Sequence, residues 1–261
     1  MVDWMIEVLT NFSCDEQTFF IAVQIMDRYF KHCKQSLKVT DLHAVGVTAM
    51  FVASKYEDIY PLRMKTIDER IAQKKIPIEQ IKNLELDILQ ALQYEIEAPT
   101  TLDFLKQLLL DVLGIQIVSR QETKKKEDFC LENKPEKMED ELRLKAKSNL
   151  NRFEELDPLS PESKWRTLAD ARKLSSEDKI ENYLIEKMCI YLAKMAMHDE
   201  NLSQQKPSLL AVSSIYVALK ICEQLKKKNY LNQTIMIRLV TISKLDQSDI
   251  LTTSQHILYL A

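Results

Sequence analysis

The chain has 261 residues, 46% of them apolar, so it can form one large domain or two modest ones, each with its own core. Its 36 Lys and Arg against 39 Asp and Glu leave a formal charge of −3, which excludes a strong global attraction to nucleic acid or an anionic membrane and favours protein partners. Its only glycines, Gly46 and Gly114, are too few for a phosphate-binding loop, and the composition favours a nearly all-helical fold.

The first third of the chain predicts three helices. An apolar stretch at 2–10 surrounds Trp4, and Asp15 is placed to cap a second helix that runs to about Cys33 with one apolar face. The third predicted helix, 41–58, has apolar or small residues all round, which is typical of a helix buried on most sides. We therefore expect it to be the central helix of a domain.

Two more helices complete this first set. Pro61 ends the central helix, a short helix is predicted over 66–73, and Pro77 lies in the first turn of a helix that reaches about Leu92. The residue before Pro99 disfavours helical geometry, so a domain boundary is expected there. The prediction is a five-helix domain over 1–98 and a second domain over 99–261.

The second domain is interrupted by a charged segment. After a predicted helix at 100–114, 17 of the 31 residues in 119–149 are Lys, Arg, Asp or Glu, with too few apolar residues for a core. We predict a largely disordered insertion over 115–177. Apolar periodicity then returns at the residues Ile180, Tyr183, Leu184, Met188, Tyr191, Leu192 and Met195.

The rest of the chain predicts a mostly apolar helix from Pro207 and two last helices at 232–243 and 246–260. Residues 43–55 (HAVGVTAMFVASK) align without gaps on 208–220 (SLLAVSSIYVALK), and the small residue Gly46 meets Ala211. Each stretch lies in the third and most apolar helix of its half. This internal repeat predicts an all-α fold made of two five-helix domains in tandem.

Catalytic, metal and nucleic-acid signatures are missing from the sequence. It contains no HExxH or GxSxG motif, and its five cysteines are widely spaced without a CxxC pair. The acidic residues fall on polar faces or in the insertion, and the lysine runs 124–126 and 226–228 have acidic neighbours and no aromatic platform, so solvated surface is the simpler reading. We expect no enzyme activity, cofactor, metal or nucleic-acid binding.

No apolar run approaches the length of about 20 residues that spans a bilayer, and the start VDWMIEV lacks the charged region of a signal peptide. We therefore expect an intracellular protein without a membrane segment.

Four ordered motifs resemble the cyclin box of A/B (mitotic) cyclins. They are VDWMIEV (2–8), IMDRYF (25–30), LHAVGVTAMFVASKYEDIYP (42–61) and IEQIKNLELDILQALQYEIEAPT (78–100). The resemblance is strong over 1–113 and weak over 178–261. It implies two cyclin-box domains and a regulatory subunit in the nucleus and/or cytoplasm that binds and activates a cyclin-dependent protein serine/threonine kinase in cell-cycle control.

In this family a lysine and a glutamate of the first box grip the mobile C-helix of the kinase, and here they match Lys55 and Glu85. The implied apolar platform and its edge comprise Val52, Tyr56, Glu57, Leu89, Tyr94 and Ile96. An intramolecular ion pair at a helix crossing is the structural alternative for Lys55 and Glu85. Core packing is the alternative for Tyr56 and Tyr94.

The family's substrate-docking groove is only partly matched, by Trp4, Glu7 and His43. The MRxxL-like segment that precedes the VDW motif in the family does not appear before Met1, so we expect a shortened form of a longer protein. Asp27 then lacks the arginine that pairs with it in the family, and we assign it, like Gly46, a structural role.

Ser160, which precedes Pro161, is a minimal proline-directed phosphorylation site. Two other functions stay open at this stage. A cyclin-fold adaptor of the transcription machinery would carry a basic face on the second domain and would not need Lys55 or Glu85. A helical enzyme would need the ligand clusters or glycine loops that the sequence lacks.

Overall fold

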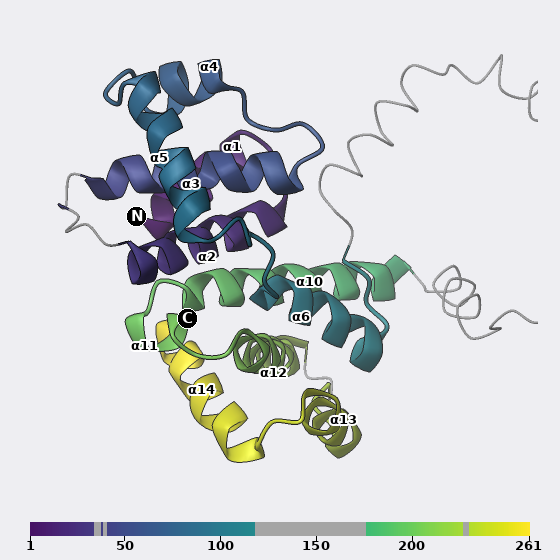
Figure 1. Ribbon diagram of the computed structural model, residues 1–261. Coiled ribbons are helices and arrows are strands. Elements are labelled where there is room, and N and C mark those ends of the chain that lie inside the picture. The colour runs from purple at the N-terminus through teal and green to yellow at the C-terminus, as the bar shows by residue number, and fades with distance from the viewer. Residues whose placement is uncertain (34–37, 39–40, 118–175, 227–229) are drawn as a thin grey trace, which may run out of the picture. The chain divides into compact units, whose positions relative to one another are not determined.

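A computed structural model describes residues 1–33, 38, 41–117, 176–226 and 230–261 (Figure 1). The described residues form helices and loops and contain no strand, which confirms the all-α prediction. Residues 1–121 together with 180–261 form one compact unit. The predicted insertion lies outside the described residues over 118–175, as does Ser160.

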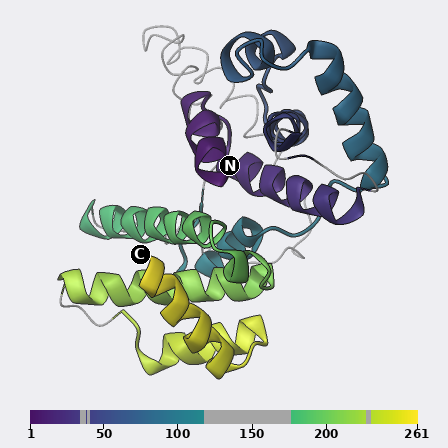
Figure 2. The ribbon, with the colours of Figure 1, turned by 90° about the vertical axis from the view of Figure 1, so that its left-hand side faces the viewer.

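The first domain is built around a central helix, as the sequence predicts. In Figure 2 this helix, α3, is seen nearly end-on, with the neighbouring helices of the domain around it. Every residue of α3 from Ala44 to Ser54 is buried, because apolar and small side chains cover all of its faces. The helical segments of this part of the chain are α1 (Val2–Asn11), α2 (Glu16–His32), α3 (Asp41–Glu57), α4 (Met64–Thr66), η1 (Ile67–Ile71), α5 (Ile78–Ala91), α6 (Thr101–Leu108) and η2 (Leu109–Leu113).

Side-chain caps set the start of two of these helices. The carboxylate of Asp15 accepts a hydrogen bond from the backbone N–H of Gln17 at 3.0 Å, as expected for the first turn of α2. Thr100 and Asp103 form a reciprocal capping box at the start of α6. The predicted position of Pro77 is wrong by one residue, because Pro77 precedes α5 and does not lie in the first turn of that helix.

Two π-helical turns, η1 and η2, were not predicted. A π-helical turn accommodates one residue more than an α-helical turn, and apolar periodicity does not reveal it. In η1 the N–H of Ala72 donates to the carbonyl of Ile67 at 2.7 Å. η2 ends at Gly114, whose φ of 70° is the left-handed geometry that glycine adopts at low cost.

The second domain repeats the plan around another apolar helix, α12. Its buried residues run nearly without a break from Leu209 to Leu219. Asn232 caps α13 by accepting from the N–H of Ile235 at 2.9 Å. The helices after the insertion are α10 (Ser176–Ala196), α11 (Glu200–Ser203), α12 (Pro207–Lys226), α13 (Gln233–Ser243) and α14 (Gln247–Leu260).

Helix α10 exists as predicted, but much of the apolar set that predicted it faces solvent. The side chains of Ile180, Tyr183 and Tyr191 are 58–63% exposed. The buried residues of α10 include Ile185, Cys189, Ile190, Leu192, Ala193 and Ala196. The helix thus has two apolar faces, and the one that packs into the core carries the small residues Cys189, Ala193 and Ala196 besides larger aliphatic side chains.

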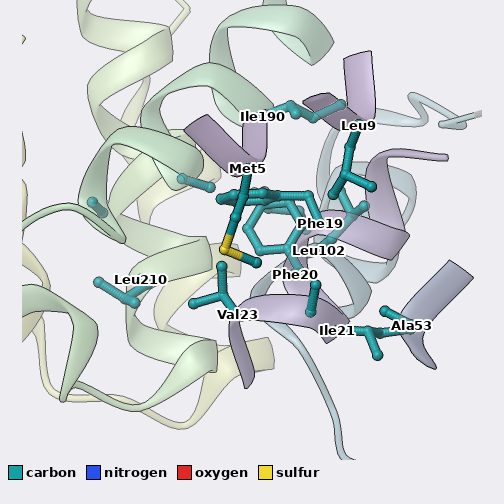
Figure 3. Packing of buried hydrophobic residues seen from close by; sticks show 14 of the residues in the cluster. Met5, Leu9, Phe19, Phe20, Ile21, Val23, Ala53, Leu102, Ile190 and Leu210 are labelled. Atoms are coloured by element: carbon teal, nitrogen blue, oxygen red, sulfur yellow. The ribbon is translucent and has the colours of Figure 1, made fainter. Parts of the chain in front are cut away.

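The core brings together residues from both halves of the chain. Figure 3 shows side chains of α1, α2, α6, α10 and α12 gathered in one buried cluster, and the labelled residues include Met5, Phe19, Leu102, Ile190 and Leu210. Polar contacts accompany this packing: Lys194 of α10 forms an ion pair with Glu16 of α2. The amide of Gln17 also donates to the hydroxyl of Thr100 at 2.9 Å. Burial of apolar surface is the main stabilising term of such a core.

Candidate functional site

Lys55 and Glu85 come together at the crossing of α3 and α5. Their side chains form an ion pair and remain 39% and 21% exposed, respectively. The Lys55 ammonium also lies over the ring of Phe51, 4.1 Å from its centroid. The intramolecular ion pair that was the structural alternative for these two residues is therefore present. Both charged groups nevertheless remain accessible at the surface.

The aromatic residues of the proposed platform are at the surface and not in the core. Tyr56 is 47% exposed and Tyr94 is 63% exposed. Loss of hydration and the nearby carboxylates of Glu97 and Glu57 raise the pKa of the Tyr56 phenol. Tyr94 follows α5 with a left-handed φ of 62°.

The aliphatic members of the platform lie deeper than the tyrosines. Leu89 and Ile96 are partly buried and pack against the core. Val52 is only 3% exposed, so it supports the platform from beneath and does not form its surface. Two exposed residues that we did not single out, Ile59 and Tyr60, follow α3 directly and are 49% and 67% exposed. The apolar pair within the motif YEDIYP is the signal that could have indicated them.

The C-terminal end of α3 is anchored by carboxylates. Asp58 is buried and accepts hydrogen bonds from the backbone N–H of Asp15 at 2.8 Å and the hydroxyl of Thr18 at 2.9 Å. Glu57 is half-buried; burial raises its pKa, the ammonium of Lys106 lowers it, and nearby carboxylates such as that of Asp15 raise it further. The hydrogen bonds of Asp58 therefore tie the end of α3 to the start of α2, close to Lys55 and Tyr56.

Asp27 and Gly46, the two residues that we expect to be structural, lie in different surroundings. Asp27 is half-buried on α2, and burial raises the pKa of its carboxyl while Lys31, one turn on, lowers it. Gly46 is buried in α3, and a Cβ at this position would lie 2.9 Å from the sulfur of Met1. The small residue therefore allows the Met1 side chain to pack against α3.

The residues of the docking prediction are only partly brought together. Trp4 and Glu7 line a surface pocket of about 580 Å³. His43 is not in its lining and instead lies against Trp4, with ring centroids 4.8 Å apart and planes inclined by 51°. The full lining comprises Trp4, Glu7, Val8, Asn11, Phe12, Arg70, Ile71 and Gln73. Sequence reasoning missed the wall supplied by η1, because nothing in the local spacing indicates its π-helical turn.

No group of three or more His, Cys, Asp or Glu side chains in the described part of the chain is arranged to hold a metal ion. One helix there, α12, contains an 18-residue window that is long and apolar enough to cross a membrane, contrary to the expectation that no apolar run approaches that length. However, 61% of that window is buried within the protein, as expected for a core helix.

Family comparisons agree with this two-domain helical architecture. The family model described as Cyclin, N-terminal domain matches residues 1–97, and the model described as Cyclin, C-terminal domain matches residues 168–261. An X-ray structure of a viral cyclin from herpesvirus saimiri aligns with a TM-score of 0.62 and 17% identity, covering 99% of this chain and 81% of that one. The class is therefore a tandem cyclin-box fold.

Sequence relatives narrow the class. G2/mitotic-specific cyclin-B of Arbacia punctulata is 36% identical over 107 residues, which is 41% of this chain and 25% of the relative. G2/mitotic-specific cyclin-B1 of Oryzias luzonensis is 34% identical over 107 residues, 41% of this chain and 26% of the relative. The chain belongs to the cyclin family, and these relatives support the A/B type. The matched stretch spans about a quarter of the length of those relatives.

Proposed function

We propose that the chain is the regulatory subunit of a cyclin-dependent protein serine/threonine kinase, which it binds as a heterodimer and activates in cell-cycle control. The observation that carries the proposal is the exposed Lys55 and Glu85 pair beside Tyr56 and Tyr94, within a domain matched by the cyclin N-terminal family model. The naming of its relatives as G2/mitotic-specific cyclins supports the same role.

The chemistry of the pair suits the end of a partner helix, where backbone N–H and C=O groups lack partners. Lys55 supplies donors and Glu85 supplies acceptor oxygens, and their mutual contact holds the two side chains beside each other. The rings of Tyr56 and Tyr94, with Leu89 and Ile96, supply apolar area next to the charges. Val52 and Glu57 support this surface from beneath and at its edge.

Activation would follow from selective binding and needs no catalytic group from this chain. The cyclin favours the kinase state in which the C-helix glutamate pairs with the lysine that positions ATP. Its effect is bounded by how much more tightly it binds that state than the inactive one.

We further propose that the pocket lined by Trp4 and Glu7 docks kinase substrates, with His43 supporting Trp4 from outside the pocket. A pocket of about 580 Å³ is large enough for the side chains of a short peptide segment. The protein would act inside the cell, in the nucleus and/or cytoplasm. Ser160 remains a predicted phosphorylation site.

Co-purification with candidate cyclin-dependent kinases, followed by phosphorylation of a histone substrate, tests the kinase proposal. Lys55→Ala and Glu85→Ala should each reduce both binding and activation. Lys82→Ala is the matched control, because Lys82 is an exposed lysine of α5 that pairs with Glu79 three residues away. Binding and activation that neither change alters would contradict the proposed site. Failure to bind any such kinase, with tight binding to duplex DNA instead, would favour the transcription adaptor.

A further inference from the structure

The pocket between α1 and η1 carries one charge of each sign. Glu7 and Arg70 are both exposed and line the same pocket. Neither has an ion-pair partner within the part of the chain that the structure describes. Both charges are therefore available to a ligand. The two side chains differ in that Arg70 lies over an aromatic ring of the pocket.

Arg70 is held against the pocket wall by an aromatic ring. The centre of its guanidinium lies 4.8 Å from the ring centroid of Phe12, which lines the same pocket. Stacking of this kind restricts the long side chain before a ligand arrives, so less conformational freedom is lost on binding. A stacked guanidinium keeps its N–H donors at its edge, in the fork geometry that matches a carboxylate.

The backbone of η1 reinforces this placement. Arg70 lies within the π-helical turn Ile67–Ile71, and the chain leaves that turn through Gln73 and Lys74, which have left-handed φ values of 52° and 59°. Such turns are frequent at functional sites. Gln73 itself lines the pocket.

The remaining lining is suited to a peptide. Trp4 supplies the accessible apolar surface of the pocket, and Val8 and Ile71, which are only 8% and 4% exposed, add little to it. The side-chain amides of Asn11 and Gln73 can donate to, and accept from, an extended peptide backbone. The lining thus combines an apolar patch, two amides and a pre-positioned guanidinium.

We infer that this pocket selects an acidic peptide segment, in which an Asp or Glu carboxylate pairs with Arg70 while a neighbouring aliphatic side chain lies on Trp4. The inference rests on the proposed docking role of the pocket and adds to it the charge of the substrate segment and the residue that reads that charge. Glu7 then disfavours a second carboxylate on its side of the pocket and fixes the direction of the peptide.

Fluorescence anisotropy of labelled peptides with the purified chain tests this inference. Each peptide carries one leucine and, one to four residues further on, an aspartate, asparagine or lysine in a Gly/Ser background. Because charge-assisted hydrogen bonds are the stronger ones, we expect the best aspartate peptide to bind about tenfold more tightly than its lysine counterpart. In Arg70→Glu this order should reverse.

Arg63→Glu is the matched control, because Arg63 is another exposed arginine of the same segment and does not line the pocket. It should keep the wild-type order of affinities, and thermal unfolding should show that both variants remain folded. Peptide binding with no charge preference, or with a preference that Arg70→Glu does not change, would overturn the inference and leave the docking pocket standing.

Absence of binding by every peptide at concentrations up to about 1 mM, where the binding free energy is only about −4 kcal/mol, would overturn both the inference and the docking proposal. Co-purification tests the kinase proposal independently, because the Arg70→Glu variant should still bind the kinase as the wild type does.

Discussion

The central helices of the two domains, α3 and α12, carry the same pattern in different surroundings. In α3 the ammonium of Lys55 lies 4.1 Å from the ring centroid of Phe51, and in α12 that of Lys220 lies 6.0 Å from the ring centroid of Tyr216. Each lysine follows its aromatic residue by four positions, which places both on one helix face. The stacked lysine is therefore part of the repeated domain plan.

The carboxylate is what distinguishes the two sites. Lys55 pairs with Glu85 of α5, whereas Lys220 has no carboxylate partner among the residues that the structure describes. A group present in one copy of a repeat and missing from the other is a better candidate for function than one present in both. This contrast favours the first domain as the kinase-binding domain.

A second pair of equivalent residues shows how each central helix is anchored. Asp58 follows α3 and accepts from the N–H of Asp15. Extending the alignment of 43–55 on 208–220 without a gap pairs Asp58 with Glu223 of α12, which accepts from the N–H of Leu231 at 2.6 Å. Both carboxylates satisfy a backbone donor outside their own helix. Only the first is buried, so the anchor should contribute more to stability in the first domain.

The largest expected effect comes from removing the aromatic rings of Phe51 and Tyr216, over which the two lysines lie. Phe51 is buried and Tyr216 is half-buried, so Phe51→Ala should lower the free energy of unfolding by about 3–5 kcal/mol and Tyr216→Ala by clearly less. Denaturant titration measures both. Equal losses would show that the two rings have equivalent structural roles and would weaken the comparison.

Removal of the anchors should have the next largest effect. Asp58→Ala leaves the N–H of Asp15 and the hydroxyl of Thr18 without this acceptor, which should cost about 2–3 kcal/mol. Glu223→Ala removes one hydrogen bond in a more accessible place and should cost about 1 kcal/mol. The same denaturant titration applies. A larger loss for Glu223→Ala would reverse the order of the two anchors.

Glu57 should make the stability of the first domain depend on pH. The position that corresponds to it in the second domain is Cys222, which has no carboxylate. Burial raises the folded-state pKa of Glu57 above its usual value of 4.5, so its protonated form is favoured by folding below pH 4.5. This contribution is lost as the pH rises through the folded-state pKa, where the buried carboxylate ionises. Glu57→Gln cannot ionise, so its melting temperature relative to the wild type should rise from pH 4 to pH 7. A difference that is constant across this range would contradict the assignment.

The smallest effect is expected at Gly46, whose equivalent in α12 is Ala211. The atom that an added Cβ would approach is the sulfur of Met1, near the free end of a flexible side chain that can move. A helical Gly→Ala change also gains about 0.5–1 kcal/mol in helix propensity. Gly46→Ala should therefore change stability by no more than about 1 kcal/mol in thermal unfolding. A loss well beyond that range would show that the Met1 contact is rigid.

The sequence predicts where the helices of this fold lie along the chain better than it predicts which face of each helix is buried. A cap and one apolar face indicated α2, and apolar or small residues on all sides indicated α3 and α12, because a helix that is apolar all round must be buried to be stable in water. In α10 two apolar faces compete, and the larger side chains Tyr183 and Tyr191 remained at the surface. A single helix pattern does not say which face its neighbours will cover.

The candidate sites show the same limit. The resemblance to the cyclin box indicated Lys55 and Glu85, and the structure brings them into contact. Arg70 and Phe12 were missed because their contact joins two elements 58 residues apart and depends on a π-helical turn. The spacing of residues in the sequence does not predict a π-helical turn. A three-dimensional structure was therefore needed to identify the residues on that side of the pocket.

The central claim is that the Lys55 and Glu85 pair, and not the repeated lysine alone, makes the first domain the kinase-binding one. Titration of a cyclin-dependent kinase with the wild type, Lys55→Ala and Lys220→Ala gives three dissociation constants that test it directly. We expect Lys55→Ala to weaken binding by at least about tenfold, corresponding to about 1.4 kcal/mol, and Lys220→Ala to leave it within about twofold. Equal weakening by the two changes, or none by Lys55→Ala, would contradict the account.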